Sequence, residues 1–359
     1  MSEPIFIARQ DTLEQEILPA HWLAQYKLFG EESYTFQDKG IWKKLCMSRA
    51  AANDRDMHAE ALEEMLTTFS AEHTGKWMLL VYGMDAAALE GLATMAAIAA
   101  NGTAMGAIAD NALLMHAIAN SETAMQRIAN SQTAMQRVAN NRGAMDAIGR
   151  SRIARDAVQA SPYYNSYIKE NDMAIAKLVV GFANLESAGY SGCAGMAADS
   201  TAMTAVAASS TAMTAVAASG VALKAIAQAY KNTANMLQFL KAVNASDTLI
   251  KRIYNTLTNA TALFGTAQLG GQYSVADANK WATTSAAPNA FLACACGYYN
   301  SGGASVDVTY NGTAIAQNKT GTRQPGSVTS TNVNAITMAP STFTENGDGW
   351  LAVQKFTVK

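Results

Sequence analysis

The four histidines are the first residues to consider for chemistry, because histidine serves both acid–base catalysis and metal binding. None belongs to an HExxH motif, and His58 is followed by Ala59 and Glu60 without a second ligand. His116 stands where neighbouring repeats carry Gln126 and Gln136, which predicts a solvated, outward position. The four residues are His21, His58, His73 and His116.

Other catalytic signatures are missing from the sequence. It contains neither a GxSxG elbow nor a phosphate-binding P-loop, and Gly270-Gly271 lacks the strand–turn–helix setting of such a loop. The acidic pairs Glu31/Glu32 and Glu63/Glu64 fit solvated surfaces better than a general-acid pair. We therefore predict no catalytic residue, no cofactor, no metal site and no enzyme.

The cysteines do not form a CxxC pair or a disulfide framework. Cys294 and Cys296 are two residues apart on an expected strand, so they share one face. We interpret them as small, buried apolar side chains rather than as metal ligands. The other two are Cys46 and Cys193.

A ten-residue repeat must supply the framework. A methionine recurs every ten residues from Met95 to Met145, and a branched aliphatic residue follows three positions later each time, from Ile98 to Ile148. The pattern returns in TAMTAVAASSTAMTAVAAS, at residues 201–219. A chain of this kind is an array of repeated units, which builds shape and surface more often than a catalytic cleft.

One repeat predicts a helix of about two turns. Met125, Ile128 and Ala129 lie on one helical face, Ser121 is a suitable N-cap, and Asn130 is a suitable left-handed residue at the C-terminus. A continuous helix would turn its methionines around its axis, because a ten-residue period holds no seam. We predict a mainly α protein, a solenoid-like array of short stacked helices, followed by a C-terminal antiparallel β domain.

The C-terminal part changes character, gaining Gly, Thr, Ser and Val. SVDVTYNGTAIAQ predicts a hairpin that turns at Asn311-Gly312, and FLACACGYY, VNAITM and ENGDGWLAVQKFTVK predict further strands. The expected divisions are a helical N-terminal docking module at 1–80, a first array at 81–160, a Tyr/Gly-rich spacer at 161–200, a second array with longer helices at 201–263, and a small β-sandwich or barrel at 264–359.

Composition excludes several classes. A net charge of −2 with 15% charged residues does not indicate nucleic-acid binding. The sequence contains no run of 18 apolar residues, so we do not expect insertion into a membrane. The N-terminus does not have the pattern of a signal peptide. We expect synthesis and assembly in the cytoplasm.

The decapeptide S-x-T-A-M-x-A-V-A-x resembles repeats of tailed-bacteriophage virion proteins, especially fibre-like proteins and tail or neck appendages. The matching residues are 121–140, with Arg127 and Arg137 in place of alanine, and 200–219. The resemblance implies a structural role in the virion, with other virion proteins as partners and a homo-oligomer, a trimer or hexamer. It also implies a β domain that contacts a host-surface glycan, for which Tyr298, Tyr299 and Trp350 are exposed-loop candidates; the alternative is that these aromatics are core.

Two other functions stay open. A cytoplasmic helical-repeat scaffold would bind a protein on the outer face of the array, which carries Gln126, Arg127, Gln136 and Arg137. Thr204 and Thr214 replace the glutamines in the second array, so the sequence does not continue this recognition surface. A tail-associated depolymerase would need clustered carboxylates, and those of the β domain are scattered.

Overall fold

The computed structural model describes residues 95–110, 112–273, 279–283, 289–298, 303–323, 327–347 and 349–359. The predicted docking module at 1–80 and the start of the first array lie outside these residues. The chain divides into two compact units, which meet in sequence at Ile168 and Lys169. Each unit is described by itself below.

The first unit is a stack of short helices, one for each repeat. Within a repeat, Ala124, Met125, Ile128 and Ala129 are buried, because positions i, i+1, i+4 and i+5 share one helical face. The helices are α6 (Met95–Ala100), α7 (Gly102–Asp110), α8 (Ala112–Ala119), α9 (Glu122–Ala129), α10 (Gln132–Ala139), α11 (Arg142–Arg150), α12 (Arg152–Ala160) and α13 (Tyr164–Tyr167). The predicted solenoid-like array of short helices is confirmed.

Ser121 begins α9 as predicted, but Asn130 ends it differently. The Ser121 hydroxyl accepts a hydrogen bond from the Ala124 amide, 3.2 Å away. Asn130 has φ −90° and ψ 3°, so the left-handed conformation expected of it is wrong. Its side-chain amide instead donates to the Gln126 carbonyl at 2.9 Å. The Gln126 carbonyl, one of the last of α9, thus accepts hydrogen bonds from both the backbone amide and the side chain of Asn130.

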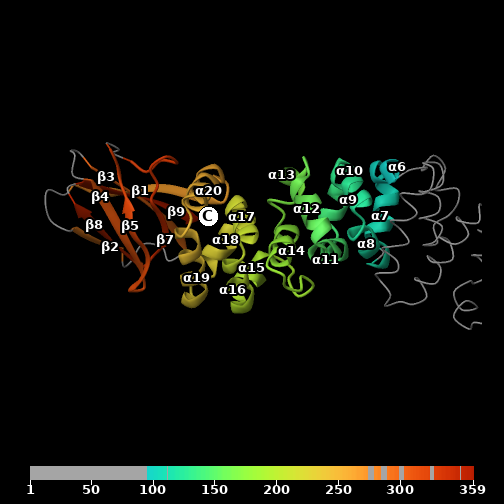
Figure 1. Cartoon of the computed structure of the whole chain (residues 1–359), viewed down its shortest axis with the longest axis horizontal. Coiled ribbons are helices and arrows are strands. Elements are labelled where there is room, and N and C mark those ends of the chain that lie inside the picture. Colours follow the sequence, from blue (N-terminus) through green and yellow to red (C-terminus); the bar gives the residue numbers. More distant parts are fainter. Residues whose placement is uncertain are drawn as a thin grey trace, which may run out of the picture. The chain divides into compact units, whose positions relative to one another are not determined.

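Three helices complete one turn of the array. The most extensive helix–helix contacts in this unit pair α7 with α10, α8 with α11, and α9 with α12 (Figure 1). Each helix therefore packs on its sequence neighbours and on the helix three positions away, so that three ten-residue repeats form a turn. A single repeat of eight or nine helical residues is too short to be stable alone, and these contacts between turns stabilise it.

Junction serines hold successive turns together. The Ser131 hydroxyl donates to the Ala99 carbonyl at 2.6 Å, 32 residues earlier. Ser151 donates in the same way to Ala119, again across 32 residues. Ser131 and Ser151 also accept the amide hydrogen bond that begins the following helix. One hydroxyl thus caps its own helix and binds the preceding turn.

The second unit begins with an array built by the same rule. Its helices are α14 (Asp172–Phe182), α15 (Cys193–Ala198), α16 (Ser200–Ala208), α17 (Ser210–Ala218), α18 (Gly220–Gln228), α19 (Thr233–Asn244) and α20 (Asp247–Asn259). Contacts again join third neighbours, from α14 with α17 to α17 with α20, and consecutive α16 and α17 are bent by 104°. The array therefore includes α14 and α15, which lie in the sequence region expected to be a spacer. Their sequences lack the decapeptide, but Ile175, Leu178 and Met196 are fully buried in the stack.

Two packed β-sheets complete the second unit. One has the order β1-β9-β3-β6, with β7 also paired to β3, and the other has the order β2-β8-β4-β5. Neighbouring strands are antiparallel, except for a two-residue parallel pair between β3 and β6. The strands are β1 (Phe264–Tyr273), β2 (Asn279–Thr283), β3 (Ala290–Tyr298), β4 (Ala304–Tyr310), β5 (Thr313–Thr320), β6 (Thr322–Arg323), β7 (Ala335–Met338), β8 (Ser341–Gly347) and β9 (Gly349–Val358).

The predicted hairpin is β4 and β5. Asn311 and Gly312 both have positive φ, 48° and 76°, as a type I′ turn requires. The burial of β4 alternates along the strand, because one face of this sheet meets the other sheet and the opposite face meets solvent. The predicted antiparallel β domain is confirmed, and the described strands form stacked sheets without closing into a barrel.

The helices and sheets of the second unit share one core. Phe239 of α19 and Phe291 of β3 have ring centroids 6.4 Å apart, and the rings of Tyr254 of α20 and Phe356 of β9 meet edge to face at 5.7 Å. Strand β3 lies between these helices and the second sheet, so it is buried on both faces from Ala290 to Gly297. The β-sandwich is therefore joined to the array by packing rather than by a linker (Figure 1).

Candidate functional site

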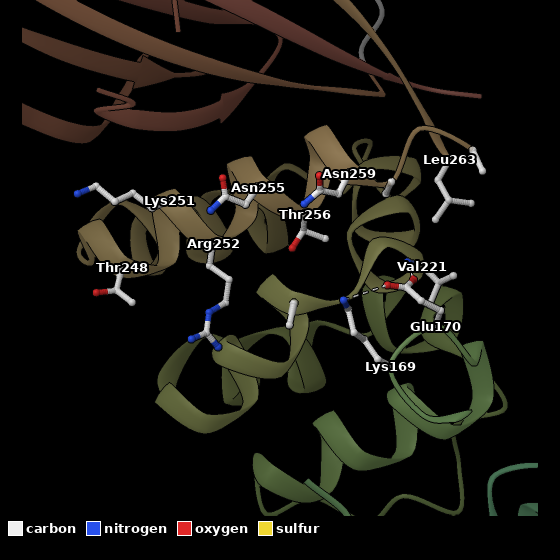
Figure 2. A pocket seen from close by; sticks show the side chains of 13 residues that line it. Lys169, Glu170, Val221, Thr248, Lys251, Arg252, Asn255, Thr256, Asn259 and Leu263 are labelled. Carbon is white, nitrogen blue, oxygen red and sulfur yellow. Dashed lines mark hydrogen bonds and ion pairs between the residues drawn. The ribbon is translucent and has the colours of Figure 1, made fainter. Parts of the chain in front are cut away.

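A groove lies beside α20, in the second unit. Its volume is about 910 Å³. One wall is the exposed face of α20, which presents the polar side chains of Thr248, Lys251, Arg252, Asn255 and Asn259 (Figure 2). These residues recur every three to four positions, so they form one row along the helix. We refer to the cavity as the α20 groove.

Apolar residues form the floor of the α20 groove. They are Ala218, Val221, Ala260, Ala262 and Leu263. Gly220 makes this arrangement possible, because a β-carbon at this position would lie 3.0 Å from Leu263 Cδ1 and 3.1 Å from Ala260 Cβ. The repeat has Ser210 one period earlier, so glycine replaces serine where the chain after α20 approaches α18.

Glu170 occupies the amino end of α18 at the edge of the groove. Its two carboxylate oxygens accept hydrogen bonds from the Gly220 and Val221 amides, each at 3.1 Å. Such a carboxylate stabilises a helix N-terminus by satisfying free amides and opposing the helix dipole. Lys169 lies 3.9 Å from the same carboxylate, as the dashed line in Figure 2 shows. This helix end is already occupied by a side chain of the protein.

Lys251 and Arg252 give the groove its charge. Neither forms an ion pair with another described residue, and both are exposed. Together with the Lys169–Glu170 pair they leave two net positive charges among the lining residues, which include three cations and one anion. The side-chain amides of Asn255 and Asn259 are exposed beside them. The groove therefore combines an apolar floor with a row of hydrogen-bond donors that suits an acidic, amphipathic ligand.

The described cysteines, which could carry covalent chemistry, do not line the groove. Burial raises the pKa of the Cys193 thiol, and the nearby Asp172 carboxylate raises it further. Burial likewise raises the pKa of Cys294. The side chains of Cys193, Cys294 and Cys296 are buried and none is in a disulfide. For Cys294 and Cys296 this agrees with the prediction of small buried side chains. A neutral, buried thiol is a poor nucleophile and a poor metal ligand.

A hydrogen-bonded pair stabilises the start of α16. The Tyr190 hydroxyl donates to the Asp199 carboxylate at 2.7 Å, and Asp199 also accepts from the Thr201 and Ala202 amides. The hydrogen bond from Tyr190 and those from the amides hold the pKa of Asp199 below its usual value. Burial, together with this hydrogen bond, raises the pKa of Tyr190 to about 12. The shift of Asp199 follows from its hydrogen bonds at the helix N-terminus, and that of Tyr190 follows first from burial.

A smaller, polar pocket lies between α7 and α10 in the first unit. Its volume is about 400 Å³, and Asp110, Gln136 and Arg137 are among its lining residues. It opens at Gly106, which stands where the next repeats place larger side chains. The Asn141 amide already donates to Asp110 at 2.7 Å, so part of the polar lining is satisfied within the protein.

The predicted site residues fall into different surroundings. Trp350 is only 2% exposed in β9, and a β-carbon on Gly297 would lie 2.3 Å from its ring, so the expectation of an exposed loop is wrong for this residue. The ring covers the glycine of the neighbouring strand, which pairs directly with Trp350. Tyr298 ends β3 and is half-buried, and Tyr299 lies outside the described residues.

His116 is the histidine that lies within the described part of the chain. His116 is half-buried, and its Nε2 lies 3.0 Å from the Asn120 side-chain nitrogen, so it is less solvated than predicted. His21, His58, His73 and Cys46 lie outside the described residues. Within the described ranges, no three His, Cys, Asp or Glu side chains are close enough to hold a metal ion.

No single helix in the described part of the chain has both the length and the apolar composition needed to cross a membrane. Among the described helices, one pair meets that test when taken together, α16 with α17, and the two are bent by 104°. Comparison with known proteins finds no match, either among protein families or among curated proteins.

Sequence reasoning missed the α20 groove. The row from Thr248 to Asn259 is visible as a helical period, but an exposed polar face alone does not indicate a groove. The apolar floor comes from Ala218, Val221 and Leu263, which lie in three different segments. The signal available in the sequence was Gly220, the first residue of α18, which replaces the serine that Ser200 and Ser210 supply at this position in the two preceding repeats.

Proposed function

We propose that this chain is a structural component of a tailed-bacteriophage particle, a fibre, collar or other tail or neck appendage. In this role the helical arrays act as spacers and the β-sandwich is the part presented at the surface. The docking module expected at residues 1–80 attaches the chain to other virion proteins. The proposal includes a homo-oligomer, a trimer or hexamer, because appendages of this kind follow the symmetry of their attachment site.

The observation that carries the proposal is the shared core between the second array and the β-sandwich. Asn244 of α19 is 3% exposed, and its side-chain amide both donates to the Ile336 carbonyl, at 2.7 Å, and accepts from the Ile336 amide, at 3.0 Å. This arrangement ties strand β7 to the array as another strand would. A domain held in this way keeps a fixed direction relative to its array, as a surface domain on a spacer requires.

The decapeptide repeat supports the same role from the sequence. The spacing of ten residues is constant within each array, and each repeat forms one third of a turn, so the length of such an array grows in regular steps. Tyr298 and Tyr299 remain the candidates for contact with a host-surface glycan, whereas Trp350 serves as core.

A cytoplasmic protein-binding scaffold is the second candidate. It is favoured by the exposure of Gln126, Arg127, Gln136 and Arg137 on the outer faces of α9 and α10. These four residues form a polar surface that a protein partner would contact. The second array offers exposed Thr204 and the half-buried Thr214 in the corresponding positions, so the surface does not continue there.

Gold labelling of purified particles separates these two functions. Antibodies raised against residues 264–359 are applied to tailed particles from the strain that carries the gene, with particles from a deletion strain as the control. The virion role predicts label at one fixed position on intact particles, and mass spectrometry should find the chain in whole-number proportion to a tail protein. Label confined to the cell extract, with particles free of the chain, would contradict the virion role and favour the scaffold.

A further inference from the structure

The polar pocket between α7 and α10, which we call the α7–α10 pocket, is opened by a departure from the repeat. Gly106 lines it, whereas every later helix from α8 to α12 carries a longer polar side chain at the same repeat position. A β-carbon on Gly106 would meet nothing within 4 Å, so close packing does not require glycine here. Because glycine destabilises a helix interior, the open recess is left without a structural reason.

A second glycine places a cation at the amino end of α7. Gly102, the first residue of this helix, stands four positions before Gly106, where α9 to α12 carry long polar side chains. A β-carbon on Gly102 would lie 3.4 Å from Nη2 of Arg137, so the guanidinium of Arg137 extends from α10 to the start of α7. Arg137 also lines the pocket. This end of the pocket combines the cation with the positive end of a helix dipole, which suits an anionic group.

Asp110 places an acid at the other end of α7. At the same repeat position, Asn120, Asn130 and Asn140 each donate a side-chain hydrogen bond to the carbonyl four residues earlier. A carboxylate cannot donate this bond, and a negative charge at a helix C-terminus opposes the helix dipole. The Asn141 amide donates to one oxygen of Asp110 at 2.7 Å. The carboxylate and the last carbonyls of α7 together suit a cationic group.

The two charges serve opposite ends of the pocket. No ion pair joins Asp110 to Arg137 within the described part of the chain. Gly102 and Asp110, which mark the two ends of α7, are about 12 Å apart along the helix at a rise of about 1.5 Å for each residue. An occupant that covers both charges removes them from water, so it must supply the opposite charge to each. Three departures that are unfavourable for α7 alone thus meet at one pocket, as is typical of a functional site.

We propose that the α7–α10 pocket binds an extended peptide segment that carries an acidic and a basic residue four positions apart. Four residues of extended chain span about 13 Å, and both side chains then lie on the same side of the segment. The acidic side chain contacts Arg137, the basic side chain contacts Asp110, and the backbone between them passes Gly106. Thr133 and Gln136 line the wall of α10, where they can hydrogen-bond to this backbone. The site is independent of the virion role, because both proposed functions require a protein partner.

Peptide titrations of the full-length chain test the two charges separately. The probes are acetyl-Lys-Gly-Ser-Gly-Glu-amide and the same sequence reversed, because the two charges do not fix the direction of the backbone. The wild type should bind one of these probes in an NMR titration. Serine in place of either the lysine or the glutamate of that probe should weaken binding about fivefold.

Two variants of the chain complete the comparison. Asp110→Asn keeps an acceptor for Asn141 but removes the charge, so loss of the lysine from the probe should then have no further effect. Arg137→Ala should in the same way abolish the effect of the glutamate. Arg127→Ala is the matched control, because Arg127 occupies the repeat position of Arg137 on α9 and does not line the pocket. The control should bind all peptides as the wild type does.

Filling the recess provides an independent measurement. Gly106→Gln introduces the residue that Gln126 and Gln136 supply at this repeat position, and the space around Gly106 is open. This variant should therefore unfold at a temperature no lower than the wild type, but it should lose binding of the probe. Wild-type affinity in Gly106→Gln would overturn the proposal, as would a wild type that binds neither probe. Equal effects of the two serine replacements in the wild type, Asp110→Asn and Arg137→Ala would also overturn it.

Discussion

The junction serines provide the sharpest test of how the arrays are held together. Ser209 and Ser210 are adjacent, but only Ser209 connects two turns. The Ser209 hydroxyl accepts a hydrogen bond from the Ala212 amide at 3.2 Å and donates to the Phe182 carbonyl at 3.0 Å. The Ser210 side chain is exposed at the first position of α17. Alanine at these two positions therefore removes the same atoms with different consequences.

The expected loss for Ser209→Ala is about 2 kcal/mol. Removal of a serine N-cap costs about 1 kcal/mol, and the loss of the partly buried hydrogen bond to Phe182 costs about 1 kcal/mol more. For a unit of this size, about 2 kcal/mol lowers the melting temperature by about 4–8 °C. Ser210→Ala should change the free energy of unfolding by less than about 0.5 kcal/mol, as exposed substitutions usually do.

Denaturant and thermal unfolding of the two variants give the comparison, and hydrogen exchange of the full-length chain locates the effect. In Ser209→Ala, but not in Ser210→Ala, exchange should accelerate at the Ala212 amide and in α14, because the Ser209 hydroxyl bonds to that amide and to the carbonyl of Phe182. Ser209→Thr retains a hydroxyl and should recover most of the loss. Equal stability of the Ser209→Ala and Ser210→Ala variants would refute the reasoning, because it would show that the bond between turns contributes nothing measurable.

Three further outcomes test the second unit. Gly297→Ala should destabilise the β-sandwich by about 1–3 kcal/mol and alter Trp350 fluorescence, because a β-carbon would lie 2.3 Å from that ring. Gly106→Ala is the control, because the space around Gly106 is open. An unchanged stability and fluorescence in the Gly297→Ala variant would contradict the contact. Asn244→Ala should cost about 2–4 kcal/mol in chemical denaturation, because two buried backbone groups of β7 lose their partner, and a loss below 1 kcal/mol would count against that role. The folded-state pKa of Asp199 lies below the unfolded value of about 3.9, so the stability that Asp199 adds is present above about pH 4 and is lost as the pH falls through the folded-state pKa. Asp199→Asn should therefore flatten the acidic part of the curve of stability against pH. An equally steep curve in the variant would show that Asp199 is not responsible.

Much of the local structure was predictable from the sequence. The Met and Ile spacing identified the buried face of each repeat, and Ser121 was recognised as an N-cap because a hydroxyl before a helical period satisfies free amides. The Asn311-Gly312 turn was predictable for the same kind of reason, since few residues accept positive φ at both positions. These features depend on residues close together in sequence.

Features that depend on distant residues were not predictable. The repeat shows that helices stack, but it does not show that the stacking partner is the third neighbour, because that depends on the angle at each junction. The hydrogen bonds of Ser131 and Ser151 to carbonyls 32 residues earlier follow from that angle. Trp350 was misplaced because its strand lies against Gly297, and a tryptophan beside a turn signal looks exposed in sequence.

The α20 groove illustrates the same limit. Its polar row was visible as an exposed helical face, but its floor comes from three segments that the fold brings together. The sequence indicated that Gly220 was unusual, and only the packing of Leu263 and Ala260 against it explained why.

The central structural claim is that helices three positions apart in the array lie against each other. A β-carbon at Gly102 would lie 3.6 Å from Thr133 Cγ2, so cysteines at these two positions are close enough for a disulfide. In a continuous helix the same residues would be about 46 Å apart. The test uses Gly102→Cys with Thr133→Cys in a Cys46→Ser background, and Gly102→Cys with Thr123→Cys, one repeat closer, as the control.

Mass spectrometry after mild oxidation is the measurement that decides. The third-neighbour arrangement predicts a 102–133 disulfide in most molecules and little or none between 102 and 123. Equal cross-linking of both pairs, or of neither, would contradict the three-helix turn.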